Sequence, residues 1–187
     1  GSSPLSTQNS SSRRTPHPET GRPIRERSRR ILSIANMSLR RVAVMGSGKI
    51  GRACAFFLQR SGSYDVTSLD HEGANLYWIK DNIPGASTRK VSFTDANAMA
   101  KALEGHDAVL AAGPFWHNPM IAEVCKRVGA HYLDLTEDVS VTQKVKELAG
   151  GAGTAFIPQC GLAPGFITIA GYNLAKSLDT VSGSASE

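Results

Sequence analysis

The chain has 187 residues, enough for one globular domain of ordinary size with a substantial core. Its formal net charge of +5 comes from the N-terminus: residues 1–41 hold nine Arg and two Glu, a charge of +7, so the remainder is near −2. No basic cluster is left on the folded part and no apolar run approaches the ~18 residues of a membrane helix, so we expect neither a nucleic-acid partner nor a membrane-embedded segment.

The first 36 residues are rich in Ser, Arg and Pro and show little apolar periodicity, so we predict that residues 1–36 form a disordered tail. An Arg- and Ser-rich N-terminus is also typical of mitochondrial transit peptides, but the prolines, Glu19 and Glu26 weaken an amphipathic helix. The plainer interpretation is that Met37 is the natural start. Residues 37–180 are then the folded domain, followed by a short tail at 181–187.

Apolar runs alternate with helical spacing throughout the folded domain. The runs predict strands at 41–45, 65–69, 89–93, 108–112, 131–135 and 154–158. Helical spacing predicts helices at 48–62, 71–84, 96–103, 119–128, 139–149 and 165–178. This alternation with short connections predicts an α/β fold, a Rossmann-like, doubly wound parallel sheet with helices on both faces.

Two details of burial follow from the same patterns. The fourth strand, AVLAA, is entirely apolar, which predicts burial on both faces of the sheet. In the first helix, Ile50, Cys54, Phe57 and Leu58 share one face and are expected to pack inward.

The stretch GSGKIG, residues 46–51, follows the first strand and opens the first helix. As an ATP-binding P-loop it fails, because Ala43 stands where the first glycine belongs and Ile50 has no hydroxyl for magnesium. A phosphate-binding loop of another kind must therefore be considered.

A dinucleotide-binding turn fits the same stretch. Gly46 allows the tight turn, Gly48 lets the backbone approach a pyrophosphate, and Gly51 lets the helix pack close to the strand. The pyrophosphate is then expected at the helix N-terminus, with N–H donors from around Lys49 and Ile50. The Lys49 side chain itself is expected to face solvent.

Asp70 lies 19 residues beyond Gly51, at the end of the second strand. An acid in this place accepts hydrogen bonds from a ribose 2′-hydroxyl and repels a 2′-phosphate, which predicts NAD in preference to NADP. The alternative is a turn or helix-capping Asp ahead of His71 and Gly73.

Ligands of this fold bind beyond the carboxyl ends of the strands, so several loops should meet there. Thr94 and Asp95 are expected near the adenine, and the Gly113-Pro114 turn near the nicotinamide. The complete predicted cofactor-binding set is Gly46, Ser47, Gly48, Lys49, Ile50, Gly51, Asp70, His71, Thr94, Asp95, Ala112, Gly113, Pro114, Cys160 and Gly161.

The catalytic residues are not identified by the sequence. His117 is a candidate acid–base group in a loop at this edge, but a surface histidine is the favoured interpretation. Glu137 and Asp138 follow the fifth strand, where acids are also common as helix starts. Three cysteines without a CxxC pair predict no metal site and no disulfide framework, and they favour a reducing, cytoplasmic setting.

Three segments together give the chain a family resemblance: RVAVMGSGKIG, DAVLAAGPFWHNPMIAEVCKRVGAHYLDLTED and IPQCGLAPG. They resemble the saccharopine dehydrogenase-like oxidoreductases, a group with saccharopine reductase, lysine 6-dehydrogenase and carboxynorspermidine dehydrogenase types. The resemblance covers Arg41 to about Leu178, the N-terminal Rossmann domain of that family.

The resemblance implies NAD(P)-linked hydride transfer at the amine-bearing carbon of a small amino-acid substrate. It also implies a second α/β domain that supplies most substrate contacts and contributes to homo-oligomers. We expect this chain to lack that second domain and therefore to have little dehydrogenase activity alone.

Two other functions remain open on the sequence. One is a non-catalytic dinucleotide-binding module, such as a redox sensor, for which the Arg-rich tail is the only candidate partner-binding segment. The other is a short-chain dehydrogenase, whose Tyr-x-x-x-Lys pair is matched by Tyr172 and Lys176. The glycine spacing argues against it, and this pair is expected on the surface of a helix.

Overall fold

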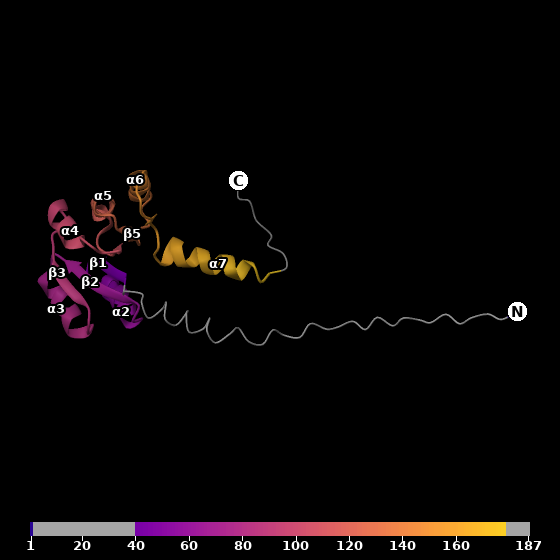
Figure 1. Cartoon of the computed structure of the whole chain (residues 1–187), viewed down its shortest axis with the longest axis horizontal. Helices are drawn as coiled ribbons and strands as arrows, with labels where there is room; N and C mark the ends of the chain where they lie inside the picture. The colour runs from indigo at the N-terminus through magenta and orange to yellow at the C-terminus, as the bar shows by residue number, and fades with distance from the viewer. Residues whose placement is uncertain (2–39, 179–187) are drawn as a thin grey trace. The chain divides into compact units, whose positions relative to one another are not determined.

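The computed structural model describes Gly1 and residues 40–178 (Figure 1). Apart from Gly1, the predicted tails at 1–36 and 181–187 lie outside the described residues. Six parallel strands form one sheet in the order β3-β2-β1-β4-β5-β6. The strands are β1 Arg40–Met45, β2 Tyr64–Asp70, β3 Ser87–Lys90, β4 Ala108–Ala111, β5 His131–Asp134 and β6 Phe156–Ile157.

Helices connect the strands at nearly the predicted positions. They are α2 Lys49–Arg60, α3 Gly73–Asn82, α4 Ala96–Leu103, α5 Asn118–Val128, α6 Val139–Ala149 and α7 Ile167–Ala175, with short helices η1 Phe115–His117 and η2 Leu162–Phe166. The chain builds the sheet outward from β1 in one direction and then from β4 in the other. The predicted doubly wound Rossmann-like sheet is confirmed, and its switch point lies between β1 and β4.

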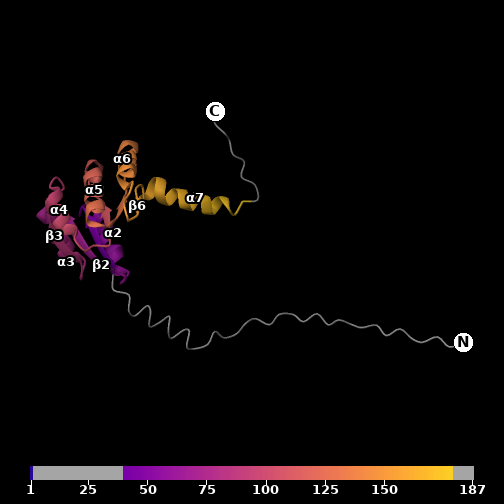
Figure 2. The same cartoon turned by 45° about the horizontal axis from the view of Figure 1, so that its top comes forward.

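The sheet has a different hydrophobic cluster on each face. On one face, Met45 of β1 and Tyr132 of β5 join Leu103, Ile121 and Val145 from α4, α5 and α6. Figures 1 and 2 both show these three helices side by side. On the other face, residues of β1 and β2 pack with α2 and α3, namely Val44, Val66, Ala55, Ile79 and Ile83.

The inward face of α2 differs from the prediction. Ile50 and Phe57 are 58% and 69% exposed, and the buried residues of the helix are Gly51 and Ala55. Close approach of a helix to a strand requires small residues at the contact, so the large apolar side chains turn outward instead. The predicted apolar face was therefore wrong at two of its four positions.

Two strand predictions also need correction. The third strand ends at Lys90 rather than Phe93, because its partner β2 ends at Asp70, opposite Lys90. Val91 and Phe93 are nevertheless buried, in the connection to α4. In β4, Val109 is buried but Leu110 is only half-buried and lines a cavity of about 380 Å³ on the opposite face, so this strand is not covered on both sides.

The ends of the helices follow familiar capping chemistry. The Asp95 side chain accepts hydrogen bonds from the Asn97 and Ala98 amides at the start of α4. Helix α5 ends at Gly129, whose φ of +73° is the left-handed conformation that glycine adopts without strain. Among residues 40–178, no helix combines the length and apolar character needed to cross a membrane.

Candidate cofactor-binding site

Gly46 ends β1 in a conformation that requires glycine. Its φ is +102°, and a Cβ added there would lie 2.7 Å from the Gly113 nitrogen. Its own amide donates to the Leu69 carbonyl at 2.7 Å. The loops after β1 and β4 are therefore in direct contact, as predicted from the shared edge of the sheet.

Gly51 is required for a related reason. A Cβ on this residue would lie 1.8 Å from the Gly46 carbonyl oxygen, whereas the nearest strand side-chain atom, Val44 Cγ1, would be 3.7 Å away. The glycine thus allows the loop to fold onto the first turn of α2. The predicted close approach is confirmed, although the main partner is the loop itself rather than the strand.

Gly48 differs from both, since the protein does not need it. A Cβ on Gly48 would meet no atom within 4 Å, and its φ of −70° is open to any residue. The adjoining N-terminus of α2 has no side-chain cap and no acid in its first turn. Its first amides lack intrahelical partners, so the open space above Gly48 fits a pyrophosphate.

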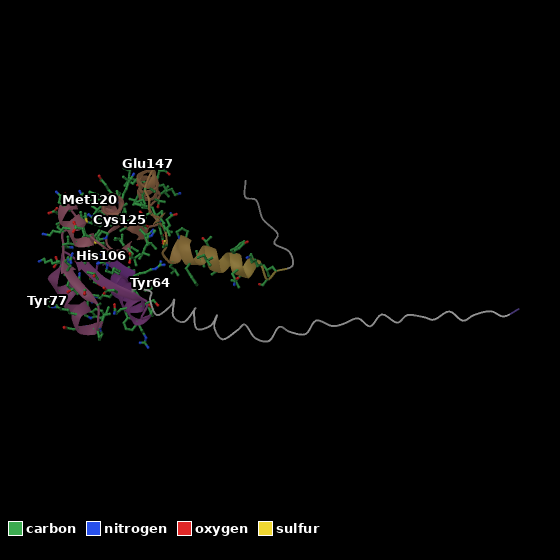
Figure 3. All side chains as sticks on the ribbon, viewed as in Figure 1. Tyr64, Tyr77, His106, Met120, Cys125 and Glu147 are labelled. Atoms are coloured by element: carbon green, nitrogen blue, oxygen red, sulfur yellow. The ribbon has the colours of Figure 1, made fainter. Side chains whose placement is uncertain are left out.

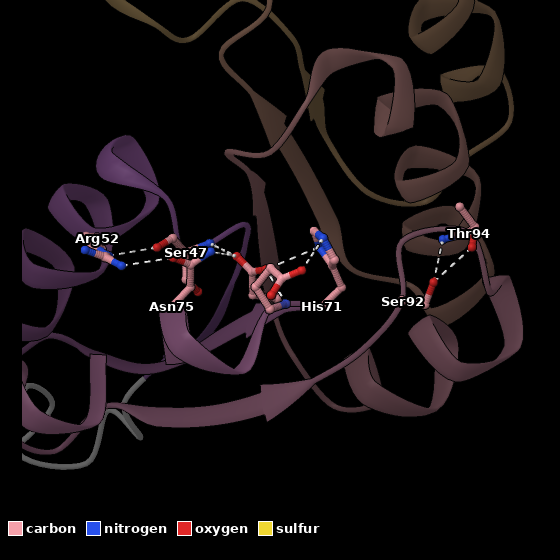
Figure 4. A network of polar contacts seen from close by, with 8 residues as sticks. Ser47, Arg52, His71, Asn75, Ser92 and Thr94 are labelled. Atoms are coloured by element: carbon pink, nitrogen blue, oxygen red, sulfur yellow. Dashed lines mark hydrogen bonds and ion pairs between the residues drawn. The ribbon is translucent and has the colours of Figure 1, made fainter. Parts of the chain in front are cut away.

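Asp70 is fixed by several donors at the end of β2, and Figure 4 shows the polar network that includes Ser47, His71 and Asn75. Asp70 is 4% exposed; its Oδ2 accepts from the Ser47 amide at 2.6 Å and its Oδ1 from the Glu72 amide at 2.8 Å. The side-chain nitrogen Nδ2 of Asn75 lies 3.4 Å from Oδ2, and His71 Nδ1 lies 3.3 Å from Oδ1. The carboxylate thus holds the glycine loop against β2 and retains part of its acceptor capacity.

Arg52 braces the same loop and was not identified from the sequence. Its Nε donates to the Ser47 carbonyl at 3.0 Å and its Nη2 to Asn75 Oδ1 at 2.9 Å (Figure 4). Its guanidinium lies 4.5 Å above the Trp78 ring. Asn75 and Trp78 come from α3, which no spacing rule for the glycine loop includes. The only indication of this role in the sequence is an arginine one turn into α2.

Two cavities have linings that include residues at or beyond the carboxyl ends of strands. One of about 600 Å³ lies beyond β4 and β5; its lining comprises Ile50, Ala111, Ala112, Gly113, Pro114, Phe115, Asn118, Leu135, Thr136, Glu137 and Asp138. The other, of about 650 Å³, lies beside β3 and α4 and includes His71, Ser92 and Asp95 in its lining.

Most of the remaining predicted residues line one of the two cavities. Ile50, Ala112, Gly113 and Pro114 line the first cavity, and His71 with Asp95 lines the second. Thr94 lies in the connection between β3 and α4, where its hydroxyl oxygen is 2.9 Å from that of Ser92 (Figure 4).

Cys160 and Gly161 lie beside the end of β5 instead. The Cys160 amide donates to the Asp134 carbonyl, and a Cβ on Gly161 would approach the Leu135 oxygen at 3.1 Å. Neither residue belongs to the lining of the first cavity.

A buried carboxylate that was not predicted from the sequence organises the loops at the ends of β5 and β6. Asp134 is fully buried; it accepts from the Tyr132 hydroxyl at 2.7 Å and from the amides of Thr136 and Gln159, each at 3.0 Å. It therefore joins the ends of β5 and β6. Burial, reinforced by the Asp134 charge, raises the pKa of Tyr132 far above its usual range, so this hydroxyl remains a donor.

Burial disfavours the thiolate form of the three cysteines at 54, 125 and 160. Burial raises the pKa of Cys125, labelled on α5 in Figure 3, to about 12. Burial likewise raises the pKa values of Cys54 and Cys160, with the Asp134 charge contributing for Cys160. Within residues 40–178, no group of three His, Cys, Asp or Glu side chains is arranged to hold a metal ion.

His117 packs against an aromatic side chain. Its ring lies edge-on to Phe93 with centroids 5.8 Å apart, and Phe93 lies edge-on to His71 at 6.0 Å. His117 is half-buried and does not belong to the lining of the first cavity, whereas the next residue, Asn118, does.

Comparisons with solved structures agree with this fold. Apo saccharopine dehydrogenase (L-Glu forming) from Saccharomyces cerevisiae matches 73% of this chain and 31% of its own, with 19% identity and a TM-score of 0.66. The NAD(P)-binding domain of an exopolyphosphatase-related protein from Archaeoglobus fulgidus matches 73% of this chain and 98% of its own, with 19% identity and a TM-score of 0.55. These likenesses establish the fold.

A sugar-nucleotide enzyme shows a similar likeness. The WlbA dehydrogenase of Chromobacterium violaceum, solved with NADH and UDP-GlcNAcA, matches 66% of this chain and 35% of its own, with 16% identity and a TM-score of 0.54. The present chain thus spans about a third of the length of the yeast and Chromobacterium enzymes.

The family is shown by a sequence-family model. The saccharopine dehydrogenase NADP-binding domain matches residues 42–157, which run from β1 through β6. This range includes the glycine loop and the ends of the strands that lie beside the two cavities. The chain belongs to the saccharopine dehydrogenase NADP-binding-domain family, and it is a Rossmann-type NAD(P)-binding domain.

Proposed function

We propose that this chain is the cofactor domain of an NAD-dependent oxidoreductase that acts on an amino-acid substrate by hydride transfer. The observation that carries the proposal is the open space above Gly48, beside an uncapped helix terminus. The protein gains nothing from glycine there, whereas a pyrophosphate in van der Waals contact with the backbone requires it. The adjoining free amides then supply the hydrogen-bond donors.

The residues of the chain would bind and orient the cofactor in three places. The first turn of α2 would hold the pyrophosphate, Asp70 would accept a hydrogen bond from a ribose hydroxyl, and Ile50 would cover one face of the nicotinamide. When bound, the nicotinamide supplies the hydride chemistry. Pro114 and Phe115 would help to exclude water from that half of the site.

The preference for NAD rests on Asp70. A 2′-phosphate placed at a buried carboxylate meets a like charge at short range, which lowers its affinity. One feature favours NADP instead: the cavity beside His71 is also lined by Arg89, Lys90 and Lys101, although Asp95 and Glu104 offset two of these charges. We propose that the nearer carboxylate decides the choice.

The amino-acid substrate is proposed from the family resemblance. The cavity beyond β4 and β5 supports it, since Glu137 and Asp138 line it and no basic side chain does. Hydrogen bonds from Val141 and Ser140 hold the pKa of Asp138 below its usual range, so this charge persists at neutral pH. We also propose that the enzyme forms homo-oligomers and acts in the cytoplasm.

Calorimetric titration of the full chain with NADH, and separately with ATP, tests the proposal. NADH is expected to bind and ATP to bind far more weakly, because the loop lacks the P-loop residues. Absence of NADH binding at millimolar concentration would reject a cofactor domain. NADH formation from NAD and individual L-amino acids then tests the substrate class.

A further inference from the structure

Helix α2 begins with two basic side chains at the end where a helix favours acidic ones. Lys49 is its first residue and Arg52 its fourth, and the first turn holds no acid. The N-terminus of a helix carries partial positive charge, so cations placed there lower the stability of the helix. The reason for these two residues must therefore lie outside the helix itself.

Arg52 holds two consecutive carbonyl groups of the glycine loop. Its backbone amide donates to the Gly48 carbonyl at 2.9 Å, and its side-chain Nε donates to the Ser47 carbonyl at 3.0 Å. Its Nη2 donates to Asn75 Oδ1 at 2.9 Å (Figure 4). The ring of bonds closes at Asp70, whose Oδ2 lies 3.4 Å from Asn75 Nδ2 and accepts from the Ser47 amide at 2.6 Å.

These bonds set the direction of the amides that follow. A peptide unit is planar and trans, so its carbonyl and the N–H of the next residue point in opposite directions. Because Arg52 holds the carbonyls of Ser47 and Gly48, the N–H groups of Gly48 and Lys49 point the other way. Both Gly48 and Lys49 are exposed, whereas Ser47 is buried, so a ligand reaches these two residues from solvent.

We propose that Arg52 is a positioning residue that holds the Ser47–Gly48 peptide so that the Gly48 N–H faces the pyrophosphate of the cofactor. This inference rests on the proposed cofactor function. Without the guanidinium the Ser47 carbonyl loses its partner, and a rotated peptide would turn that oxygen toward the phosphates and repel them. The Trp78 ring, 4.5 Å from the guanidinium, limits its movement. A bound anion also accounts for the two cations at this helix terminus.

The test uses three ligands that share the pyrophosphate and differ elsewhere: NADH, NADPH and ADP-ribose. Their dissociation constants are measured calorimetrically for wild type, Arg52→Lys, which keeps the charge but not the planar fork of donors, and Arg52→Gln, which also loses the charge. Urea unfolding of each protein reports its stability separately.

Arg60→Gln is the matched control. Arg60 lies on the same helix, in its last turn, about 12 Å along the axis from Arg52. Its guanidinium also lies over an aromatic ring, 5.7 Å from the centroid of Phe56. The control therefore removes an arginine of α2 without touching the glycine loop.

Both Arg52 variants are expected to bind all three ligands about tenfold more weakly than wild type. The factor should be the same for each ligand, because the lost contact is to the pyrophosphate that they share. Arg60→Gln should bind as wild type does. A purely structural role would lower the free energy of unfolding and leave the dissociation constants unchanged, which would contradict the inference.

Two further results would overturn it. Arg52→Lys with the affinity of wild type would show that charge alone suffices, and a loss confined to NADPH would assign Arg52 to the 2′-phosphate instead. Failure of wild type to bind NADH or ADP-ribose would reject the cofactor function itself, and the inference with it.

Asn75→Ala decides the matter if neither Arg52 variant folds. This substitution removes the second partner of the guanidinium and opens the ring without changing the charge of the site. Its NADH affinity should fall about threefold, the worth of a weakened hydrogen bond. An unchanged NADH affinity would contradict the inference.

Discussion

Gly48 and Gly51 belong to the same glycine-rich segment, but each is a glycine for a different reason. A methyl group on Gly51 would collide with the Gly46 carbonyl at 1.8 Å, whereas one on Gly48 would enter open space. The first glycine is thus attributed to a ligand and the second to the fold. The sequence motif specifies both positions and cannot separate these causes.

The pair makes a matched prediction. Gly48→Ala should leave the free energy of unfolding within about 1 kcal/mol of wild type and weaken NADH binding about tenfold or more, since the methyl occupies the pyrophosphate's place. Gly51→Ala should lose about 1–3 kcal/mol of stability or more. Urea unfolding and calorimetry measure the two effects, and an unchanged NADH affinity in Gly48→Ala would disprove the pyrophosphate placement.

His106 gives the domain a pH-dependent stability. Burial lowers its pKa, with smaller contributions from Arg41 and Arg89, while its Nδ1 lies 3.2 Å from the Leu103 carbonyl. The folded state therefore favours the neutral ring. Stability from this group is complete above the ordinary value of about 6.5 and declines as the pH falls through it toward the lowered folded value.

His106→Gln should reduce that acid-side decline. The measurement is the free energy of unfolding at about pH 7.5 and about pH 5 for both proteins, where only wild type carries the His106 contribution. An equally steep loss of stability in the variant would show that other groups cause the decline.

At the scale of elements, α4 depends on its N-terminal cap. Asp95 accepts from two amides of the first turn, so Asp95→Ala should cost about 1 kcal/mol, whereas Asp95→Asn, which also caps, should cost a few tenths. Urea denaturation of the three proteins compares these values. Equal stability of wild type and Asp95→Ala would contradict the cap.

The elements were largely predictable from periodicity, and the exceptions have physical causes. Helix α6 begins and ends where predicted, and α4 does as well, because each has a capping Asp ahead of an apolar stripe. Strand β3 was misplaced because its end is set by pairing with β2, not by its own apolar residues. The buried face of α2 was misassigned because close packing selects Gly51 and Ala55 over Phe57.

The site was predictable where it follows a short motif and not where it depends on distant partners. The glycine loop and Asp70 follow from spacing along the chain. Arg52 and Asn75 form a pair 23 residues apart, which no local pattern reveals. The role of Asp134 likewise depends on Gln159, which belongs to the following strand connection.

For the whole molecule, binding and folding are linked. A ligand that binds only the folded state at one hundred times its dissociation constant adds about 2.7 kcal/mol, which should raise the melting temperature by roughly 5–10 °C. Thermal unfolding with increasing NADH measures this shift. No increase at saturating NADH would contradict a site that is formed only in the folded domain.

The glycine loop and Asp70 together are proposed to form a site for NAD, and a titration with both cofactors tests this proposal. Wild type and Asp70→Asn are titrated calorimetrically with NADH and NADPH. Wild type should bind NADH about tenfold more tightly than NADPH, because the carboxylate repels the 2′-phosphate, and the variant should show a much smaller difference. Tighter binding of NADPH than of NADH by wild type would contradict the account.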